Sequence, residues 1–297
     1  MIEGTSQSAA RELFVAFKNS PALLGASALA NVYLTTVLLG LSANASWIVV
    51  PLVAVAVYVL DDVIDRLDTD EDQFEPKSRE AFYSSPLLVG AVAIGAYVLA
   101  LVIAVVWGGP LAIALTLVPG ISGALYSLPW LSVARADRVK DVFVLNTALI
   151  AGAIALPGTL LPVAFATEPV SVTATAALTL FWFVRYFVGV ETCNVPDLED
   201  DRREGVATLP TRYGVDGTRK LLYAGDLLAL TLLLAFVMPV SDLLPVALML
   251  PFLGLSLVFT YALERPSLQA PICVGWDGLH VVMGAAVAVG VNVAAIL

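Results

Sequence analysis

The chain has 297 residues, of which 59% are hydrophobic and only 13% are charged. A soluble domain cannot bury that much apolar surface, so the composition excludes a soluble globular protein and indicates a polytopic membrane protein. The formal net charge of −10 is concentrated, because residues 61–80 and 191–204 hold more than half of the acidic side chains. This distribution favours local acidic sites, and we expect no nucleic-acid partner.

The first twenty residues carry charged side chains and no apolar core, so we expect a cytoplasmic N-terminal segment and no signal peptide. Beyond it, apolar stretches recur at about 20 residues, the length at which a helix crosses a bilayer. Only Gly108-Gly109-Pro110 separates the third stretch from the fourth. We predict a single all-α membrane domain over residues 1–297, with nine spans at 21–41, 45–61, 86–107, 109–130, 141–162, 170–192, 220–239, 242–263 and 277–297.

Basic residues favour one side of these spans. The outer turns near residues 42–44, 108–109, 167–168 and 240–242 hold no Lys or Arg, and neither does the C-terminus. This positive-inside pattern predicts a cell-membrane protein with a cytoplasmic N-terminus and an outside C-terminus. The inside basic residues are Arg11, Lys18, Arg66, Lys77, Arg79, Arg135, Arg138, Lys140, Arg202, Arg203, Arg212, Arg219, Lys220 and Arg265.

Two acidic segments follow the second and the sixth predicted spans, at residues 61–72 and 194–201. The two spans are four apart in the chain, so they run in the same direction. This repetition predicts two parallel four-helix halves plus a terminal ninth helix, with a site between the halves. Both acidic segments then lie at the cytoplasmic face.

The spacing of the acids suggests metal binding. Asp61 and Asp65 are four residues apart, as are Asp197 and Asp201, so each pair shares a helix face. Mg²⁺ prefers oxygen ligands and commonly binds through one or two carboxylates together with substrate phosphates. We therefore expect these four residues to hold Mg²⁺ and a diphosphate. Basic residues close to the motifs would contact the phosphate oxygens, and the candidates are Lys77, Arg79, Lys140, Arg202 and Arg203.

The acidic segments resemble the paired motifs of the UbiA superfamily of intramembrane prenyltransferases, which includes 4-hydroxybenzoate polyprenyltransferase. Members carry N-D-x-x-D-x-x-x-D and then D-x-x-D-x-x-x-D. This chain has Asp61-Asp62-x-x-Asp65 and Asn194-x-x-Asp197-x-x-x-Asp201. It departs from the family at Asp61, at Thr69 in place of the last Asp of the first motif, and at Asn194. The flanking sequences agree too: Glu75-Pro76-Lys77-Ser78-Arg79, Leu125-Tyr126-Ser127-Leu128-Pro129 and Gly205-Val206-Ala207-Thr208-Leu209-Pro210.

The resemblance implies Mg²⁺-dependent transfer of an isoprenyl group from its diphosphate to a hydrophobic acceptor in the membrane. The acceptor could be an aromatic ring, a quinone precursor, a lipid or a carotenoid. On this basis we expect Asp62 and Tyr126 to be catalytic and Asn194 to contact the diphosphate, with the donor tail in a lipid-facing groove. Candidates to line that groove are Phe181, Trp182, Tyr186 and Phe187.

Two other classes stay open. One is a transporter or ion-binding membrane protein that uses the acids as cation sites. The other is a catalytically inactive family member, an alternative that the departure from the family motif at Thr69 supports.

Further expectations concern single polar residues in the spans. We expect Arg185 to pair with Glu191, His280 to form a hydrogen bond between helices or an acid–base pair with Asp277, and Cys193 and Cys273 to stay unbridged.

Overall fold

The computed structural model describes residues 21–68, 85–127 and 142–296, and all regular structure in these ranges is helical. The long helices of the first part are α2 (Pro21–Leu38), α3 (Ser46–Asp68), α5 (Pro86–Ile103) and α6 (Gly109–Ser127). Those of the second part are α7 (Leu145–Ala164), α8 (Val172–Cys193), α10 (Leu209–Leu232), α11 (Leu243–Ala262) and α12 (Pro266–Ile296). Shorter elements are η2 (Ala104–Gly108), α9 (Leu198–Glu204), η4 (Leu233–Val237) and η5 (Met238–Val240).

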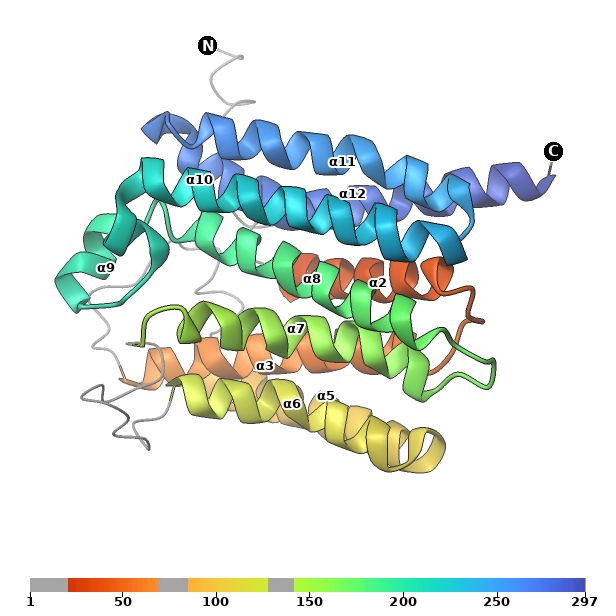
Figure 1. Cartoon of the computed structure of the whole chain (residues 1–297). Coiled ribbons are helices and arrows are strands. Elements are labelled where there is room, and N and C mark those ends of the chain that lie inside the picture. The colour runs from red at the N-terminus through yellow and green to blue at the C-terminus, as the bar shows by residue number, and fades with distance from the viewer. Residues whose placement is uncertain (1–20, 69–84, 128–141, 297) are drawn as a thin grey trace, which may run out of the picture.

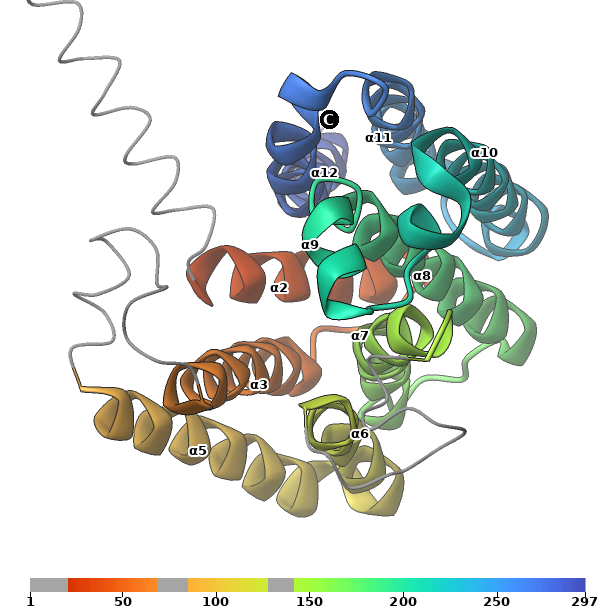
Figure 2. The same ribbon diagram turned by 90° about the vertical axis from the view of Figure 1, so that its left-hand side faces the viewer.

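Within the described residues, eight segments are long and apolar enough to cross a membrane. One of them, Pro86–Leu125, has 40 residues. A straight helix of that length would extend about 60 Å, twice the thickness of the hydrocarbon core. Gly109 prevents this with a φ of 72°, a value that glycine adopts without a Cβ clash. The chain turns there, and α5 and α6 both pack against α3 (Figures 1 and 2). The nine predicted helices are thus present in the described part of the chain.

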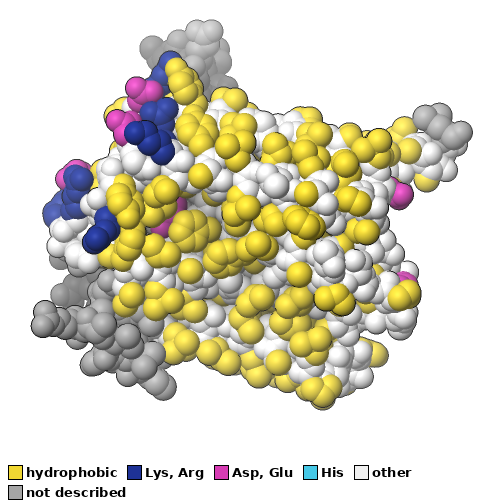
Figure 3. All heavy atoms as spheres, viewed as in Figure 1, with side chains coloured by type: hydrophobic (Ala, Val, Ile, Leu, Met, Phe, Trp, Pro, Cys, Tyr) yellow, Lys and Arg dark blue, Asp and Glu magenta, His cyan; other side chains and the backbone are white. Residues whose placement is uncertain are grey.

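In chain order, the nine long helices of the described residues divide into two groups of four and a last helix. The first group contains α2, α3, α5 and α6, and the second contains α7, α8, α10 and α11. The last helix, α12, packs against α2, α8 and α11, and α7 packs against α2 and α6, so both helices join the two groups (Figure 2). Apolar side chains cover the middle of the surface, while Lys and Arg gather at the end that carries α9 (Figure 3). This distribution suits a bundle whose sides contact lipid and whose α9 end contacts water.

Two helices begin earlier than their predicted spans. We predicted spans from residues 220 and 277, whereas α10 starts at Leu209 and α12 at Pro266. At the start of α10, the Thr208 hydroxyl accepts a hydrogen bond from the Thr211 amide, and a proline lies in the first turn. Both features start helices regardless of hydropathy, so the first turns of α10 form although they are polar.

The buried arginine has a different partner from the one we expected. Arg185 on α8 forms an ion pair with Asp226 on α10, and the Arg185 guanidinium also donates to the Ser256 hydroxyl on α11 at 2.9 Å. The predicted pairing of Arg185 with Glu191 is wrong, because six residues along a helix turn the side chain by about 600°, to a different face. Arg185 and Asp226 are only 2% and 4% exposed, so this is an ion pair inside the bundle.

The two cysteines also differ from expectation. Cys193 at the end of α8 and Cys273 on α12 form a disulfide across 80 residues of sequence. We expected free thiols, and the reason for the difference is the return of the chain after α11. It brings the first turns of α12 against the last turn of α8, so that the two Cα atoms are 4.8 Å apart.

Polar contacts join the turns at the opposite end of the bundle. The Ser42 amide donates to Glu168 Oε1 at 3.2 Å, and Asn44 Nδ2 donates to the Pro162 carbonyl at 3.0 Å. Hydrogen bonding, first of all from the Ser42 side chain, holds the pKa of the Glu168 carboxyl below its ordinary value. The α2–α3 turn is thereby tied to the α7–α8 region.

Candidate active site

The first acidic motif lies on the last turns of α3, which end at the same end of the bundle as α9 (Figure 1). Asp61 and Asp62 are half-buried there. The helix continues to Asp68, so the backbone places Asp61 and Asp65 on one face, one turn apart. The side chain of Asp65, and Thr69 as a whole, lie outside the described residues.

The second motif follows the sixth long helix, α8, as we predicted, and most of it forms a separate short helix, α9. After α8 ends at Cys193 the chain makes a turn, and Asp197 becomes the residue that starts α9. The Asp201 amide bonds to the Asp197 carbonyl at 2.9 Å, so the two acids stand one turn apart. Gly205, with a φ of 76°, ends the helix. The predicted spacing of the pair holds, although its support is a different element.

Thr208 contacts the second motif, a role that sequence reasoning missed. Its hydroxyl donates to Asp201 Oδ2 at 3.2 Å. The same residue starts α10 in a reciprocal capping arrangement with Thr211. The sequence signal was present in the Gly205-to-Pro210 segment, because a Thr directly before a helix with proline in its first turn is typical of a capping residue. The orientation of Asp201 thus depends on where α10 begins.

Asn194 and the basic residues of the second motif are also positioned by neighbours. Asn194 is half-buried and its Nδ2 donates to Glu191 Oε2 at 3.2 Å. Arg202 and Arg203 are exposed and pair with Glu199 and Asp200 on their own helix, at 2.9 and 2.7 Å. Such exposed pairs are weak, so both guanidinium groups can exchange partners for an anionic ligand. Among the other predicted phosphate contacts, Lys77, Arg79 and Lys140 lie outside the described residues, as does the side chain of Tyr126.

The donor atoms at this end suit a hard cation. Asp61, Asp197 and Asp201 offer carboxylate oxygens, and Thr208 contributes a hydroxyl beside Asp201. Mg²⁺ is commonly bound by one or two carboxylates with water and substrate phosphate completing the shell, so the ligand types fit. Within the described ranges, no three His, Cys, Asp or Glu side chains meet as a ready-made metal cluster. The carboxylates therefore lie on two separate elements that a bridging ligand would have to join.

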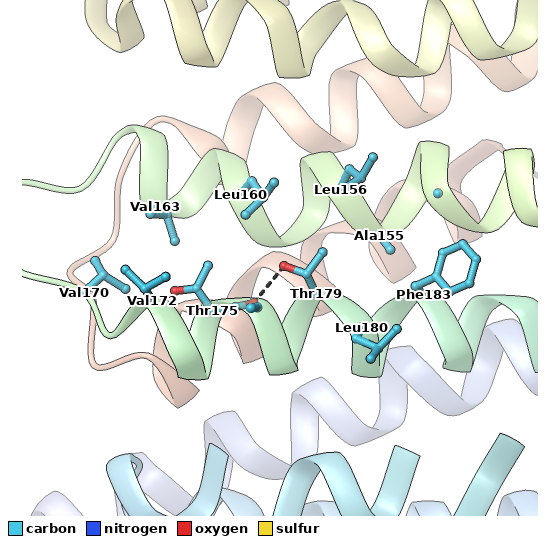
Figure 4. A pocket seen from close by; sticks show the side chains of 12 residues that line it. Ala155, Leu156, Leu160, Val163, Val170, Val172, Thr175, Thr179, Leu180 and Phe183 are labelled. Atoms are coloured by element: carbon cyan, nitrogen blue, oxygen red, sulfur yellow. Dashed lines mark hydrogen bonds between the residues drawn. The ribbon is translucent and has the colours of Figure 1, made fainter. Parts of the chain in front are cut away.

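Three of the four aromatic residues expected to line a groove are core residues instead, and the fourth, Phe187, is half-buried beside Phe183. Phe181 and Trp182 are fully buried, and Tyr186 is nearly so, because this face of α8 meets the central helices. A groove of about 760 Å³ lies between α7 and α8, lined by apolar side chains and two threonines, among them Leu156, Thr175 and Phe183 (Figure 4). It extends from Phe183 to the outer end of α8, away from the acidic end, so we give it no part in diphosphate chemistry.

The histidine forms neither of the contacts we expected. Within the described part of the chain, both ring nitrogens of His280 lack a hydrogen-bond partner. The ring instead stacks on Tyr186, with 5.4 Å between centroids. Asn146 on α7 donates to the Ala207 carbonyl at 3.3 Å and so joins α7 to the segment after α9.

Residues 18–272 match the model of the UbiA prenyltransferase family. The chain belongs to this family. It is therefore a prenyltransferase and an integral membrane protein, as the two motifs and the helical bundle had indicated. No curated protein is significantly similar to it in sequence.

Solved structures share the fold at low identity. A UbiA homolog from Aeropyrum pernix K1 is 13% identical, with a TM-score of 0.65 over 91% of this chain and 97% of that one. A digeranylgeranylglyceryl phosphate synthase is 15% identical, with a TM-score of 0.61 over 94% and 97%. A UbiA homolog from Archaeoglobus fulgidus, bound to GPP and Mg²⁺, is 16% identical, with a TM-score of 0.60 over 92% and 98%. The UbiA fold thus covers nearly all of this chain.

Proposed function

We propose that this protein transfers an isoprenyl group from an isoprenyl diphosphate to a hydrophobic acceptor within the membrane, with Mg²⁺ at the two acidic motifs. One observation carries the proposal: the last turns of α3 and the helix α9 bring separate carboxylates to the same end of a UbiA-family bundle. A UbiA homolog of this fold has been solved with GPP and Mg²⁺. We place this end on the cytoplasmic side, following the distribution of Lys and Arg.

The residues take the following roles. Asp61, Asp65, Asp197 and Asp201 hold the metal, which when bound supplies positive charge to the departing diphosphate. Asn194 and the basic side chains Lys77, Arg79, Lys140 and Arg202 contact the phosphate oxygens. Asp62 and Tyr126 act at the reacting carbon, where the electron-rich face of the tyrosine ring favours a developing cation.

The bond changes balance without a further reactant. The bond between the first prenyl carbon and the diphosphate oxygen breaks, and its electron pair leaves with the diphosphate. A new bond to that carbon forms from an electron pair of the acceptor, which then releases a proton. The apolar walls of the bundle exclude water, which would otherwise capture the prenyl group.

The test uses purified protein in lipid nanodiscs with labelled geranylgeranyl diphosphate, Mg²⁺ and a membrane lipid extract as the acceptor source. We expect Mg²⁺-dependent diphosphate release that Asp197→Ala and Asp65→Ala each abolish. Asp242→Ala is the matched control, because this exposed acid starts α11 at the opposite end of the bundle, and it should keep the wild-type rate. Absence of diphosphate release from the wild type under all these conditions would exclude the proposed activity. Mass spectrometry of the labelled product then identifies the acceptor.

A further inference from the structure

One buried carboxylate, that of Glu191, holds together the two ends of the segment that carries the second motif. Residues 194–208 connect α8 to α10 and include α9 with Asp197 and Asp201. Glu191, in the last turn of α8, accepts hydrogen bonds from the first residue of this segment and from Leu209, the first residue of α10. Asn194 Nδ2 and the Leu209 amide donate to its Oε2, at 3.2 and 3.0 Å. The connection between the two helices is therefore a loop whose ends meet at a single side chain.

A third helix fixes that carboxylate. The Thr147 hydroxyl on α7 donates to Glu191 Oε1 at 2.5 Å. The preceding residue, Asn146, holds the Ala207 carbonyl within the same loop, at 3.3 Å. Glu191 is 1% exposed, and burial of a carboxylate at such a position is costly unless donors surround it. Three donors from three parts of the chain meet this requirement and make the position of Glu191 specific.

Glu191 influences the second motif through the first residues of α10. Leu209, held by Glu191, directly follows Thr208, whose hydroxyl donates to Asp201 Oδ2 at 3.2 Å. Displacement of the Leu209 amide would therefore move Thr208 and turn Asp201. Residues behind metal ligands commonly tune affinity in this way.

We propose that Glu191 is a positioning residue that sets the affinity of the second motif for Mg²⁺ and diphosphate, acting through hydrogen-bond geometry. This inference rests on the proposed function, because it presumes that Asp197 and Asp201 bind the metal. Glu191 itself touches neither metal nor substrate. It ties the loop to α7 and to the start of α10.

If Glu191 acts through hydrogen-bond geometry, two substitutions at this position should have different effects. Glu191→Gln can keep the network, because its carbonyl oxygen accepts from Asn194 and Leu209 while its amide donates to the Thr147 hydroxyl, which is also an acceptor. Glu191→Leu fills a similar volume and offers no acceptor, so Asn194 and Leu209 lose their common partner.

The readout is direct binding, independent of turnover. Full-length protein in nanodiscs is titrated with Mg²⁺ in the presence of inorganic diphosphate, and the rise in melting temperature reports occupancy. We expect Glu191→Leu to raise the half-saturating Mg²⁺ concentration about tenfold or more. Thr147→Val, which removes one bond to the carboxylate, should raise it about threefold. Glu191→Gln should stay within about twofold of the wild type. Thr179→Val on α8, the helix of Glu191, is the control, since the Thr179 hydroxyl donates to the Thr175 carbonyl of its own helix.

Every possible result of this titration either supports or contradicts the positioning role of Glu191. If Glu191→Leu does not fold, the comparison of Thr147→Val with Thr179→Val decides alone. Unchanged Mg²⁺ binding in folded Glu191→Leu or Thr147→Val overturns the inference. Equal loss in Glu191→Gln and Glu191→Leu also overturns it, because the charge and not the geometry would then matter. A wild-type protein that binds no Mg²⁺ with diphosphate refutes the proposed function, whereas binding that no variant alters refutes the positioning role alone.

Discussion

Arg185 and Asp226 show how a bundle of this composition accommodates charge. The pair is buried between α8 and α10, Ser256 on α11 contacts both partners, and the guanidinium carbon lies 4.5 Å from the centre of the Trp276 ring. Four helices thus meet at one cation. Such a pair contributes little to the net free energy of unfolding, but removal of one partner is costly, because the other would be left as a buried uncompensated charge.

We predict that Asp226→Asn lowers the free energy of unfolding by about 3 kcal/mol, since it leaves the Arg185 charge buried without its counter-ion. Denaturant unfolding in detergent micelles measures the loss. Asp216→Asn is the matched control, because Asp216 is exposed and pairs with Arg219 on its own helix; it should cost about 1 kcal/mol at most. Equal losses in the two variants would show that Arg185 does not depend on Asp226.

Single residues also show where sequence reasoning stops. The spacing of Asp197 and Asp201 could be interpreted directly, because four residues make one helical turn wherever the helix lies. The partners of Arg185 and Glu191 could not be predicted in this way. Their hydrogen bonds join residues 41 and 44 positions apart in the sequence, and such bonds depend on which faces of the helices meet. Hydropathy assigns a residue to a span and leaves the direction of its side chain open.

At the scale of elements, the start of α7 stores backbone strain. Val144, the residue before this helix, has a φ of 66°, and it is the described non-glycine residue with a positive φ. A β-branched side chain in this region is a genuine outlier. Val144 lies three residues before Thr147, so the strained turn leads directly into the residue that contacts Glu191. Strain of this kind often marks segments whose position matters for function.

Val144→Gly should raise the free energy of unfolding by about 1 kcal/mol, because glycine adopts a positive φ without the Cβ clash. Val142→Gly provides the comparison, since Val142 has no positive φ and gains nothing from the added freedom. Thermal unfolding of both variants in nanodiscs is the measurement. A destabilisation by Val144→Gly as large as that by Val142→Gly would contradict the strained backbone.

The elements were largely predictable from the sequence and the loops were not. Nine apolar stretches became the nine long helices of the described ranges, because length and hydropathy dictate a span. The helix α9 is too short and too charged to register in such a pattern, and its limits depend on the turn before Asp197 and on Gly205. The family motif located the acids, whereas the element that carries them emerged only from the backbone.

At the scale of the whole molecule, the disulfide between α8 and α12 bears on orientation. Cytosolic thiols are normally kept reduced. If the α9 end faces the cytoplasm, Cys193 and Cys273 should be free in intact cells and should bridge once the purified protein is oxidised. Alkylation of cells before lysis, followed by mass spectrometry of unreduced peptides, distinguishes the two states. A disulfide already trapped in cells would contradict the cytoplasmic orientation of the acidic end.

The oxidised protein should also be more stable than a Cys193→Ser, Cys273→Ser double variant, by about 2–4 kcal/mol, because the bridge restricts a loop of 80 residues in the unfolded chain. Unfolding curves with and without reductant measure this difference. Addition of reductant to the double variant is the control and should change nothing. Wild-type curves that reductant leaves unmoved would mean that the bridge does not restrict the unfolded state.

The packing of α12 against α2 bears on circular permutation of the protein, in which the two ends of the chain are joined by a linker. Seven long helices lie between them in the described chain, so the two run in the same direction, and the end of α12 lies at the end of the bundle opposite α9 (Figure 1). A linker joining Ile296 to Pro21 would have to return through about 30 Å of hydrocarbon, where an irregular backbone finds no hydrogen-bond partners. Circular permutation therefore requires a tenth helix, even though the helices to be joined are already neighbours.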